Sequence, residues 1–220
     1  DDQKKVLAGT FSSSEQGAAM LSTLYGEKQL DSKIFSLAAA ERIQQARADD
    51  PAAAEILASV KARMEEERKQ FEARLAKYMD IANRVEGDPK RGEELFQTCL
   101  MCHRVGDKGQ SIAPALDGSA SRDTESLLTA LLEPDAAVER AYSIFRVTRK
   151  DNTTVEGYLS NRDDNGTTIS FMGGSKVFIP MEDIKSQSFL GGRSFMPRGL
   201  IDNYSEQEVA DLLAYIGTLK

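Results

Sequence analysis

The first 86 residues alternate apolar and charged positions with the period of an α-helix. The run "SKIFSLAAAERIQQARA" and the longer run that begins at Pro51 both follow this period, and Asp50-Pro51 marks a break between them. In the longer run, six apolar side chains form one stripe at the helical period: Val60, Met64, Phe71, Leu75, Tyr78 and Ile81. No convincing fixed-length repeat is present, although paired helices are typical of the end of an α-solenoid. We therefore expect residues 1–86 to be an α-helical region used for packing or docking.

A second pattern, with the period of a β-strand, extends from Tyr142 to Phe189. Runs such as "TTVEGYL", "TTISFM" and "KVFIP" are separated by the turn-forming pairs Asn165-Gly166 and Gly173-Gly174. Four or five strands of this length make a small antiparallel sheet or a partly closed barrel. The pattern predicts such a β subdomain, with its own core, over residues 143–190.

Helical patterns lie on both sides of this β region. Upstream, "EGDPKRGEELFQTC" predicts a helix with Asp88 as N-cap and Pro89 at its first position. At the end of the chain, Ser205 and Glu208 form a predicted capping box before an amphipathic run. We expect the two helices to pack against each other through four residues: Gly92, Phe96, Leu212 and Tyr215.

Composition excludes several classes of protein. A hydrophobic fraction of 40% and a charged fraction of 29% are globular values, and a net charge of −7 provides no basic surplus for nucleic acid. No stretch of about 18 apolar residues predicts a transmembrane segment. The opening "DDQKKVLAG" does not resemble a signal peptide. We expect that a signal has been removed or that the chain is part of something longer.

Both cysteines of the chain and its only histidine lie within five positions, as Cys99, Cys102 and His103. A structural zinc site needs four ligands, and no further Cys or His is available. A redox Cys-x-x-Cys pair normally opens a helix after a strand, and no strand pattern precedes Cys99. A simple disulfide is the remaining alternative to Cys-x-x-Cys-His, the attachment motif of c-type haem. On one helical turn, two sulfurs can each bind a haem vinyl group while the adjacent imidazole lies under the iron.

These motifs together resemble a class I cytochrome c made of residues 87–142 joined to residues 191–220. Gly92-x-x-x-Phe96 and Leu212-x-x-Tyr215 are similar to the family's crossing terminal helices. The resemblance implies that the carbonyl of Pro114 accepts a hydrogen bond from the proximal imidazole, and that Arg122 approaches a haem propionate.

A haem iron that transfers electrons needs a sixth ligand, and no second histidine exists. Seven methionines are present, and most are expected to fill the core. Met196 is followed by proline in a loop just before the last helix, where the family has its distal methionine. The resemblance therefore implies axial ligation of the iron by His103 and Met196, which lie 93 positions apart.

That separation exceeds what a compact class I cytochrome c needs, and the β subdomain accounts for the excess. The order "LLEPDAAVERAYSIFRVTRKDNTTVEGYL", "IPMEDIKSQSF", "FMPRGL" resembles a bacterial haem-binding domain found at the C-terminal end of large secreted, dehydrogenase-like multidomain proteins. The expected fold is mainly α, with a class I cytochrome c fold interrupted by a small antiparallel sheet or barrel and preceded by the helical region.

The resemblance implies an extracytoplasmic electron carrier, in the periplasm or an equivalent compartment, with one covalent haem c and no catalytic residues. Its partner is expected to be a redox protein such as a dehydrogenase, and neither nucleic acid nor a transmembrane segment is expected. Two alternatives remain open at this point. In the first, the sixth position of the iron is open or labile and serves sensing or catalysis. In the second, the helical and β parts form a partner-binding module.

Overall fold

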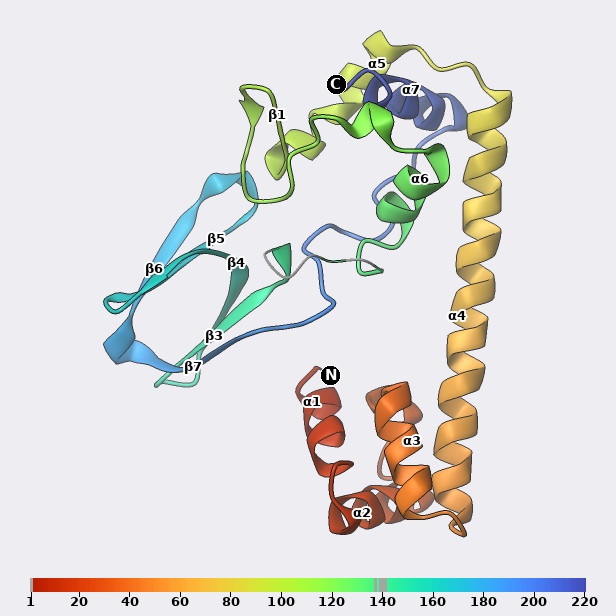
Figure 1. The fold of residues 1–220 in the computed structure, drawn as a ribbon, viewed down its shortest axis with the longest axis vertical. Coiled ribbons are helices and arrows are strands. Elements are labelled where there is room, and N and C mark those ends of the chain that lie inside the picture. Colours follow the sequence, from red (N-terminus) through yellow and green to blue (C-terminus); the bar gives the residue numbers. More distant parts are fainter. Residues whose placement is uncertain (1, 137, 139–141) are drawn as a thin grey trace. The chain divides into compact units, whose positions relative to one another are not determined.

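The computed structural model describes residues 2–136, 138 and 142–220 (Figure 1). The chain divides into two compact units, residues 1–72 and residues 73–220. The predicted run "LLEPDAAVERAY" includes residues 137 and 139–141, which lie outside the described residues.

The N-terminal unit is helical, as the sequence predicts. Ser14 and Ser36 each accept a hydrogen bond from the backbone N–H three residues on and so cap the helices that follow them. Asp50 accepts hydrogen bonds from the Ala52 N–H and from the Ser22 hydroxyl, which confirms the predicted break before Pro51. The elements are α1 (Asp2–Phe11), α2 (Glu15–Gly26), η1 (Ser32–Ile34), α3 (Leu37–Ala46) and the start of α4 (Pro51–Arg84).

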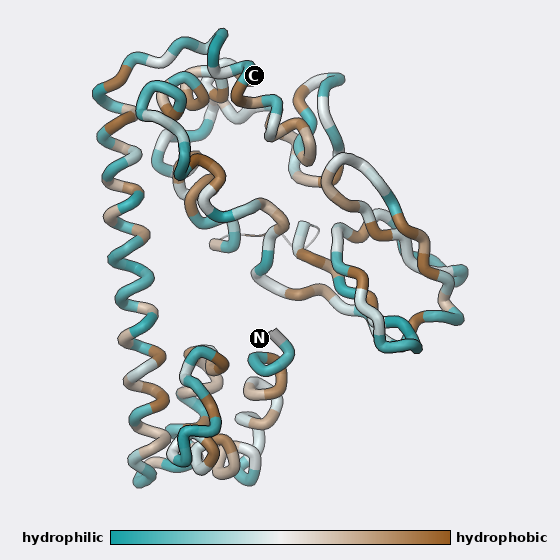
Figure 2. The backbone as a smooth tube through the Cα atoms, turned by 180° about the vertical axis from the view of Figure 1, so that it is seen from behind, coloured by the Kyte–Doolittle hydropathy of each residue, from teal (hydrophilic) through white to brown (hydrophobic). Residues whose placement is uncertain are grey.

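Helix α4 is 34 residues long and extends from the first unit into the second. Val60, Tyr78 and Ile81 of the predicted apolar stripe are buried. Met64 is 44% exposed, so its predicted place in the core is wrong. The middle of α4 is predominantly hydrophilic (Figure 2). In this stretch Arg68 pairs with Glu65 and with Glu72, which lies one turn further along the helix. The exposed Met64 therefore lies at the start of a charged, solvent-facing stretch of α4.

The prediction that methionines fill the core is also wrong for most of the others. Five of the seven are exposed in the structure: Met20, Met64, Met101, Met172 and Met181. Their hydrophobicity does not determine burial: the five lie on helices or in short 3-10 turns, at positions that the fold leaves uncovered. Composition alone cannot separate these positions from core positions.

In the C-terminal unit, helix α5 (Pro89–Phe96) packs against helix α7 (Glu206–Ile216), as predicted (Figure 1). Asp88 is the N-cap of α5, and Ser205 with Glu208 forms the predicted capping box of α7. The helices approach closely at Gly92, where an added Cβ would lie 2.0 Å from the Asp211 carbonyl oxygen. Only glycine permits this backbone approach.

An ionic cluster around a buried carboxylate at the same crossing was not predicted from the sequence. Asp211 is 2% exposed and accepts hydrogen bonds from Arg91 Nε at 2.7 Å and from the Asp88 backbone N–H at 2.7 Å. Gln207 donates a further bond to the same carboxylate at 2.8 Å. Arg91 first, and then the other donors, hold the pKa of Asp211 well below its usual value against the effect of burial. The cluster joins the start of α5 to the middle of α7.

Between these two helices the chain forms α6 (Thr124–Leu132) and then an antiparallel sheet of five strands in the order β6-β5-β4-β3-β7. A small antiparallel sheet was predicted for this part of the sequence. The buried side chains Phe145, Val147, Ile169 and Ile179 form its core. The strands are β3 (Phe145–Arg149), β4 (Thr154–Asp163), β5 (Gly166–Ser170), β6 (Lys176–Pro180) and β7 (Ile184–Phe189), with η5 (Met172–Gly174) and η6 (Met181–Asp183) between them.

Candidate functional site

The Cys-x-x-Cys-His segment follows α5 directly and turns tightly. Residues 99–101 form the 3-10 turn η2 (Cys99–Met101). The Cys102 and His103 N–H groups both donate to the Cys99 carbonyl oxygen, at 3.1 and 2.9 Å. This turn lets both sulfurs and the imidazole line the same cavity.

The His103 ring is oriented by the Pro114 carbonyl, which lies 2.6 Å from Nδ1. Because a carbonyl oxygen can only accept, Nδ1 carries the proton and Nε2 keeps the lone pair that can bind a metal. Burial lowers the pKa of His103, and the hydrogen bond to Pro114 opposes that effect. The structure thus places a neutral imidazole with one free metal-binding nitrogen in the cavity.

A short hairpin of β1 (Arg104–Val105) and β2 (Lys108–Gly109) follows His103 directly in the chain. Gly109 has φ of +87°, and a Cβ there would lie 2.2 Å from the His103 carbonyl oxygen. The Gln110 N–H donates to that carbonyl at 3.1 Å, and Asp117 accepts from the Gly106 N–H at 2.8 Å. The proximal side is therefore built from residues close together in the sequence.

Both cysteines are free thiols in the structure. Burial raises the pKa of Cys99 to about 11 and raises the pKa of Cys102. Redox-active Cys-x-x-Cys pairs instead have a thiol with a lowered pKa, so the environment does not favour that alternative. Within the described part of the chain, no group of three or more His, Cys, Asp or Glu side chains could hold a metal ion by itself.

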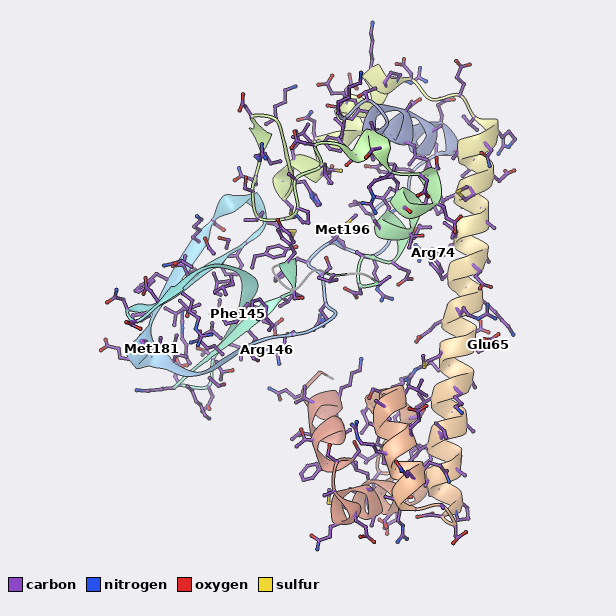
Figure 3. The ribbon with its side chains drawn as sticks, in the orientation of Figure 1. Glu65, Arg74, Phe145, Arg146, Met181 and Met196 are labelled. Carbon is purple, nitrogen blue, oxygen red and sulfur yellow. The ribbon has the colours of Figure 1, made fainter. Side chains whose placement is uncertain are left out.

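One cavity of about 660 Å³ gathers the predicted site residues, although they come from widely separated parts of the sequence. All six predicted positions line it: Cys99, Cys102, His103, Pro114, Arg122 and Met196. Figure 3 labels Met196 on the segment between β7 and α7. The Arg122 side chain is exposed and donates to the Ser126 carbonyl oxygen at 3.4 Å.

The cavity fits a haem in size and chemistry. Its volume lies within the range of about 300–1,000 Å³ that is usual for cofactor sites. Apolar side chains from α6, α7 and the connecting loops supply much of the wall, among them Leu116, Leu127, Leu131, Leu200 and Ile216. Two thiols, one metal-binding nitrogen and methionine thioethers form a donor set that a covalently attached haem can use.

Two residues of the lining come from the β subdomain and were missed in the sequence. Tyr158 on β4 lines the cavity, and its ring centroid lies 5.1 Å from that of Phe195. Burial raises the pKa of Tyr158, which also has hydrogen-bonding interactions with Ser194 and with the Phe195 backbone. Met172 in η5 lines the cavity as well and is 49% exposed. No local motif marks these positions, because only the docking of the sheet brings them to the cavity.

Comparison with known proteins identifies the class of this domain. Residues 89–156 match the cytochrome c family. A stretch of 38 residues is 47% identical to cytochrome c2 iso-2 of Rhodospirillum centenum and covers 17% of this chain. The chain spans 31% of the length of that relative.

Residues 89–156 therefore constitute a cytochrome c domain. Proteins of this family bind a haem, contain its iron and transfer electrons. The family implies that haem c is bound covalently, which agrees with the free thiols of the motif. Cytochrome c domains are usually extracytoplasmic. Among the helices that the structure describes, none is long and apolar enough to cross a membrane. The matched residues extend from α5 into β4, whereas α7, which packs against α5, lies beyond them.

Proposed function

We propose that this protein transfers single electrons through one haem c, with His103 and Met196 as the axial ligands of the iron. Cys99 and Cys102 are the two thioether attachment points, and the chain has no further cysteine for a second site of this kind. The observation that supports the proposal is the single cavity lined by both thiols, the imidazole and Met196. When bound, the haem supplies one-electron chemistry.

The surrounding residues bind and orient this group and exclude water from it. Pro114 keeps the proton on Nδ1 of His103, and this leaves Nε2 free for the metal. Arg122 lies at an exposed part of the lining, where a guanidinium group can pair with a propionate. With Met196 as a thioether ligand beside the His103 nitrogen, a bound haem would favour the reduced state relative to one held by two nitrogen ligands.

Three methionines line the cavity, and Met196 is the best placed of them to act as distal ligand. Met101 lies between the two attachment cysteines, on the proximal side, and is 51% exposed. Met172 is 49% exposed. Met196 is half-buried and precedes Pro197, which restricts the backbone next to it.

We further propose that residues 87–142 and 191–220 form a class I cytochrome c fold, interrupted by the β subdomain 143–190 and preceded by the helical region 1–86. The helices α5 and α7 pack directly against each other although the strands of the sheet lie between them in the sequence, and this supports the division. From the resemblance to the bacterial haem-binding domain, we also propose that the chain is the C-terminal part of a secreted, dehydrogenase-like protein. It would be located outside the cytoplasm and would receive electrons from a dehydrogenase.

The test is absorption spectroscopy of the reduced protein before and after the addition of carbon monoxide, on the wild type and on Met196→Leu. We expect no change for the wild type, because the thioether fills the sixth position, and rapid formation of a carbonyl spectrum for the variant. Met172→Leu is the matched control, since it removes a thioether from the same cavity, and it is expected to behave as wild type.

A carbonyl spectrum in the wild type would contradict ligation by Met196 and favour a sensor or catalyst with an open sixth position. An effect confined to Met172→Leu would assign the ligand to the β subdomain instead. The binding-module alternative predicts that deletion of residues 143–189 abolishes partner binding and leaves the haem spectrum unchanged.

A further inference from the structure

The loop that contains Met196 lacks the usual backbone support. Among the described residues, no backbone-to-backbone hydrogen bond involves residues 194–198. Just before this segment, the Arg193 carbonyl oxygen accepts a hydrogen bond from the Ile144 N–H at 3.1 Å. Just after it, the Gly199 carbonyl oxygen accepts one from the Asp202 N–H at 3.1 Å. The five residues centred on Met196 therefore need other contacts to keep one conformation.

One carboxylate outside the loop supplies such contacts on both sides of the methionine. Asp135, in the turn after α6, accepts a hydrogen bond from the Ser194 N–H to Oδ1 at 2.7 Å. Its second oxygen, Oδ2, lies 3.3 Å from the Arg198 guanidinium. Asp135 thus contacts the chain two residues before and two residues after Met196.

Ser194 extends this contact to Met196 itself. The Met196 N–H donates to the Ser194 hydroxyl oxygen at 3.0 Å. The backbone N–H of Ser194 is therefore bonded to Asp135 while its side chain accepts from Met196. A continuous series of hydrogen bonds connects the carboxylate to the backbone of the proposed distal ligand.

The two bonds of the carboxylate differ in the support they provide. The Ser194 N–H is a fixed backbone donor at a short distance, and hydrogen bonds to charged groups are among the stronger ones. Arg198 is 60% exposed and also pairs with Glu133 at 3.2 Å, so its contact is screened by solvent and shared. Of the two bonds of Asp135, the one to Ser194 is therefore expected to contribute more to the position of the loop, beside the contacts of Tyr158 with Ser194 and Phe195.

We propose that Asp135 is a positioning residue for Met196: it bonds the Ser194 backbone and keeps the loop in the conformation that directs the thioether to the iron. This inference rests on the proposed ligation by Met196. It assigns to Asp135 a role in the sixth coordination position without contact with the cofactor.

The experiment compares Asp135→Ala with the wild type in the haem-loaded protein. We expect the carbon monoxide reaction of the reduced variant to increase at least about tenfold, because the lost bond shifts the loop toward detached conformations. The reduction potential is expected to fall, and the near-infrared band of ferric methionine-ligated haem is expected to weaken. Ser194→Ala, which removes the acceptor of the Met196 N–H, should change the same readouts in the same direction.

Two control variants separate positioning from general destabilisation. Asp135→Asn keeps an oxygen that can accept from Ser194 and is expected to retain a spectrum close to wild type. Asp117→Ala removes a carboxylate that also bonds a backbone N–H and lies near an arginine, but on the proximal side. Its reduced form should remain inert to carbon monoxide.

The outcomes distinguish this inference from the proposed function. If the wild type is inert and Asp135→Ala is equally inert with an unchanged potential, the positioning role is wrong and ligation by Met196 stands. If Asp117→Ala becomes as reactive as Asp135→Ala, general loosening explains both, and the positioning role is again wrong. A wild type that itself binds carbon monoxide would overturn both proposals.

Discussion

The proximal and distal sides of the proposed haem site are built in different ways. On the proximal side, both cysteines, His103 and Pro114 lie within 16 consecutive residues, joined by short-range hydrogen bonds. On the distal side, Met196 depends on Asp135, 61 positions earlier in the chain. Tyr158, which lines the cavity from β4, comes from a third part of the sequence.

This difference separates two properties of the site. A local turn with covalent attachment can keep the imidazole in place even when distant parts of the fold move. A ligand on a loop that depends on long-range contacts can detach without unfolding of the domain. We therefore expect substitutions on the distal side to change ligation, and substitutions in the α5–α7 crossing to change stability.

The largest effect is expected from the attachment cysteines. Replacing both residues, as Cys99→Ser with Cys102→Ser, should abolish covalent haem completely, because no other thiol is available. Haem staining after denaturing electrophoresis measures this loss. Met101→Leu, a change between the two cysteines, should leave the stain unchanged. Covalent haem in the double variant would contradict the assigned attachment points.

The next largest effect is expected at the helix crossing. Gly92→Ala should lower the free energy of unfolding by about 3 kcal/mol, since the new Cβ would lie 2.0 Å from the Asp211 carbonyl oxygen. Urea denaturation measures the change. Gly217→Ala is the matched control, because its nearest neighbours are 3.5 Å away. An equal loss in the two variants would refute the proposed steric cause.

The buried Asp211 carboxylate should make this crossing sensitive to acid. Its pKa in the folded protein lies below the ordinary value of 3.8, so it contributes stability above that value and loses it as the pH falls. Asp211→Asn should cost about 2 kcal/mol at neutral pH. The gap between variant and wild type should narrow at about pH 3, where the unfolded carboxyl is largely protonated.

Urea denaturation of both proteins at the two pH values is the measurement for Asp211. Asp80→Asn is a suitable control, because the Asp80 side chain is 69% exposed and its ion pair with Arg84 lies at the surface. Surface pairs of this kind contribute little. A cost for Asp211→Asn that stays constant between the two pH values would show that charge is not its cause.

The smallest effect is expected from Arg198 on the distal side. Its side chain is 60% exposed, so Arg198→Gln should change the free energy of unfolding by less than about 0.5 kcal/mol. The reduced variant should stay inert to carbon monoxide. If Arg198→Gln reacts with carbon monoxide as fast as Asp135→Ala does, the main support of the loop is the bond between Asp135 and Arg198 and not the bond between Asp135 and Ser194. Carbon monoxide titration of the two variants side by side decides between them.

Local sequence was sufficient for elements whose stabilising contacts lie within a few residues. The N-cap at Asp88 and the capping box of Ser205 with Glu208 were predicted and are confirmed. The same holds for the helix break before Pro51 and for an antiparallel sheet in the C-terminal part. At the two helix starts, the residues that satisfy the backbone groups are near neighbours in the chain. The sheet also contains the long-range pair of β3 and β7, and the alternation of its strands was sufficient to predict a sheet but not this pairing.

Burial and long-range contacts were less predictable. Met64 matches the helical stripe but is exposed, because periodicity describes one face of a helix and not what covers that face. Asp211 resembles a surface residue of an amphipathic helix, yet Arg91 and the start of α5 enclose it. Such contacts depend on which elements meet, and the spacing of residues within one element does not specify this.

The sequence by itself determined the chemistry of the proximal side, because two thiols, an imidazole and their spacing define the attachment motif without reference to any other segment. It also indicated Met196 by its place before the last helix. Only the tertiary structure brought Tyr158 and Met172 to the cavity and placed Asp135 beside the Met196 loop. The physical reason is the range of the interactions: a turn closes through its own backbone, whereas a distal wall exists only after separate elements have packed together.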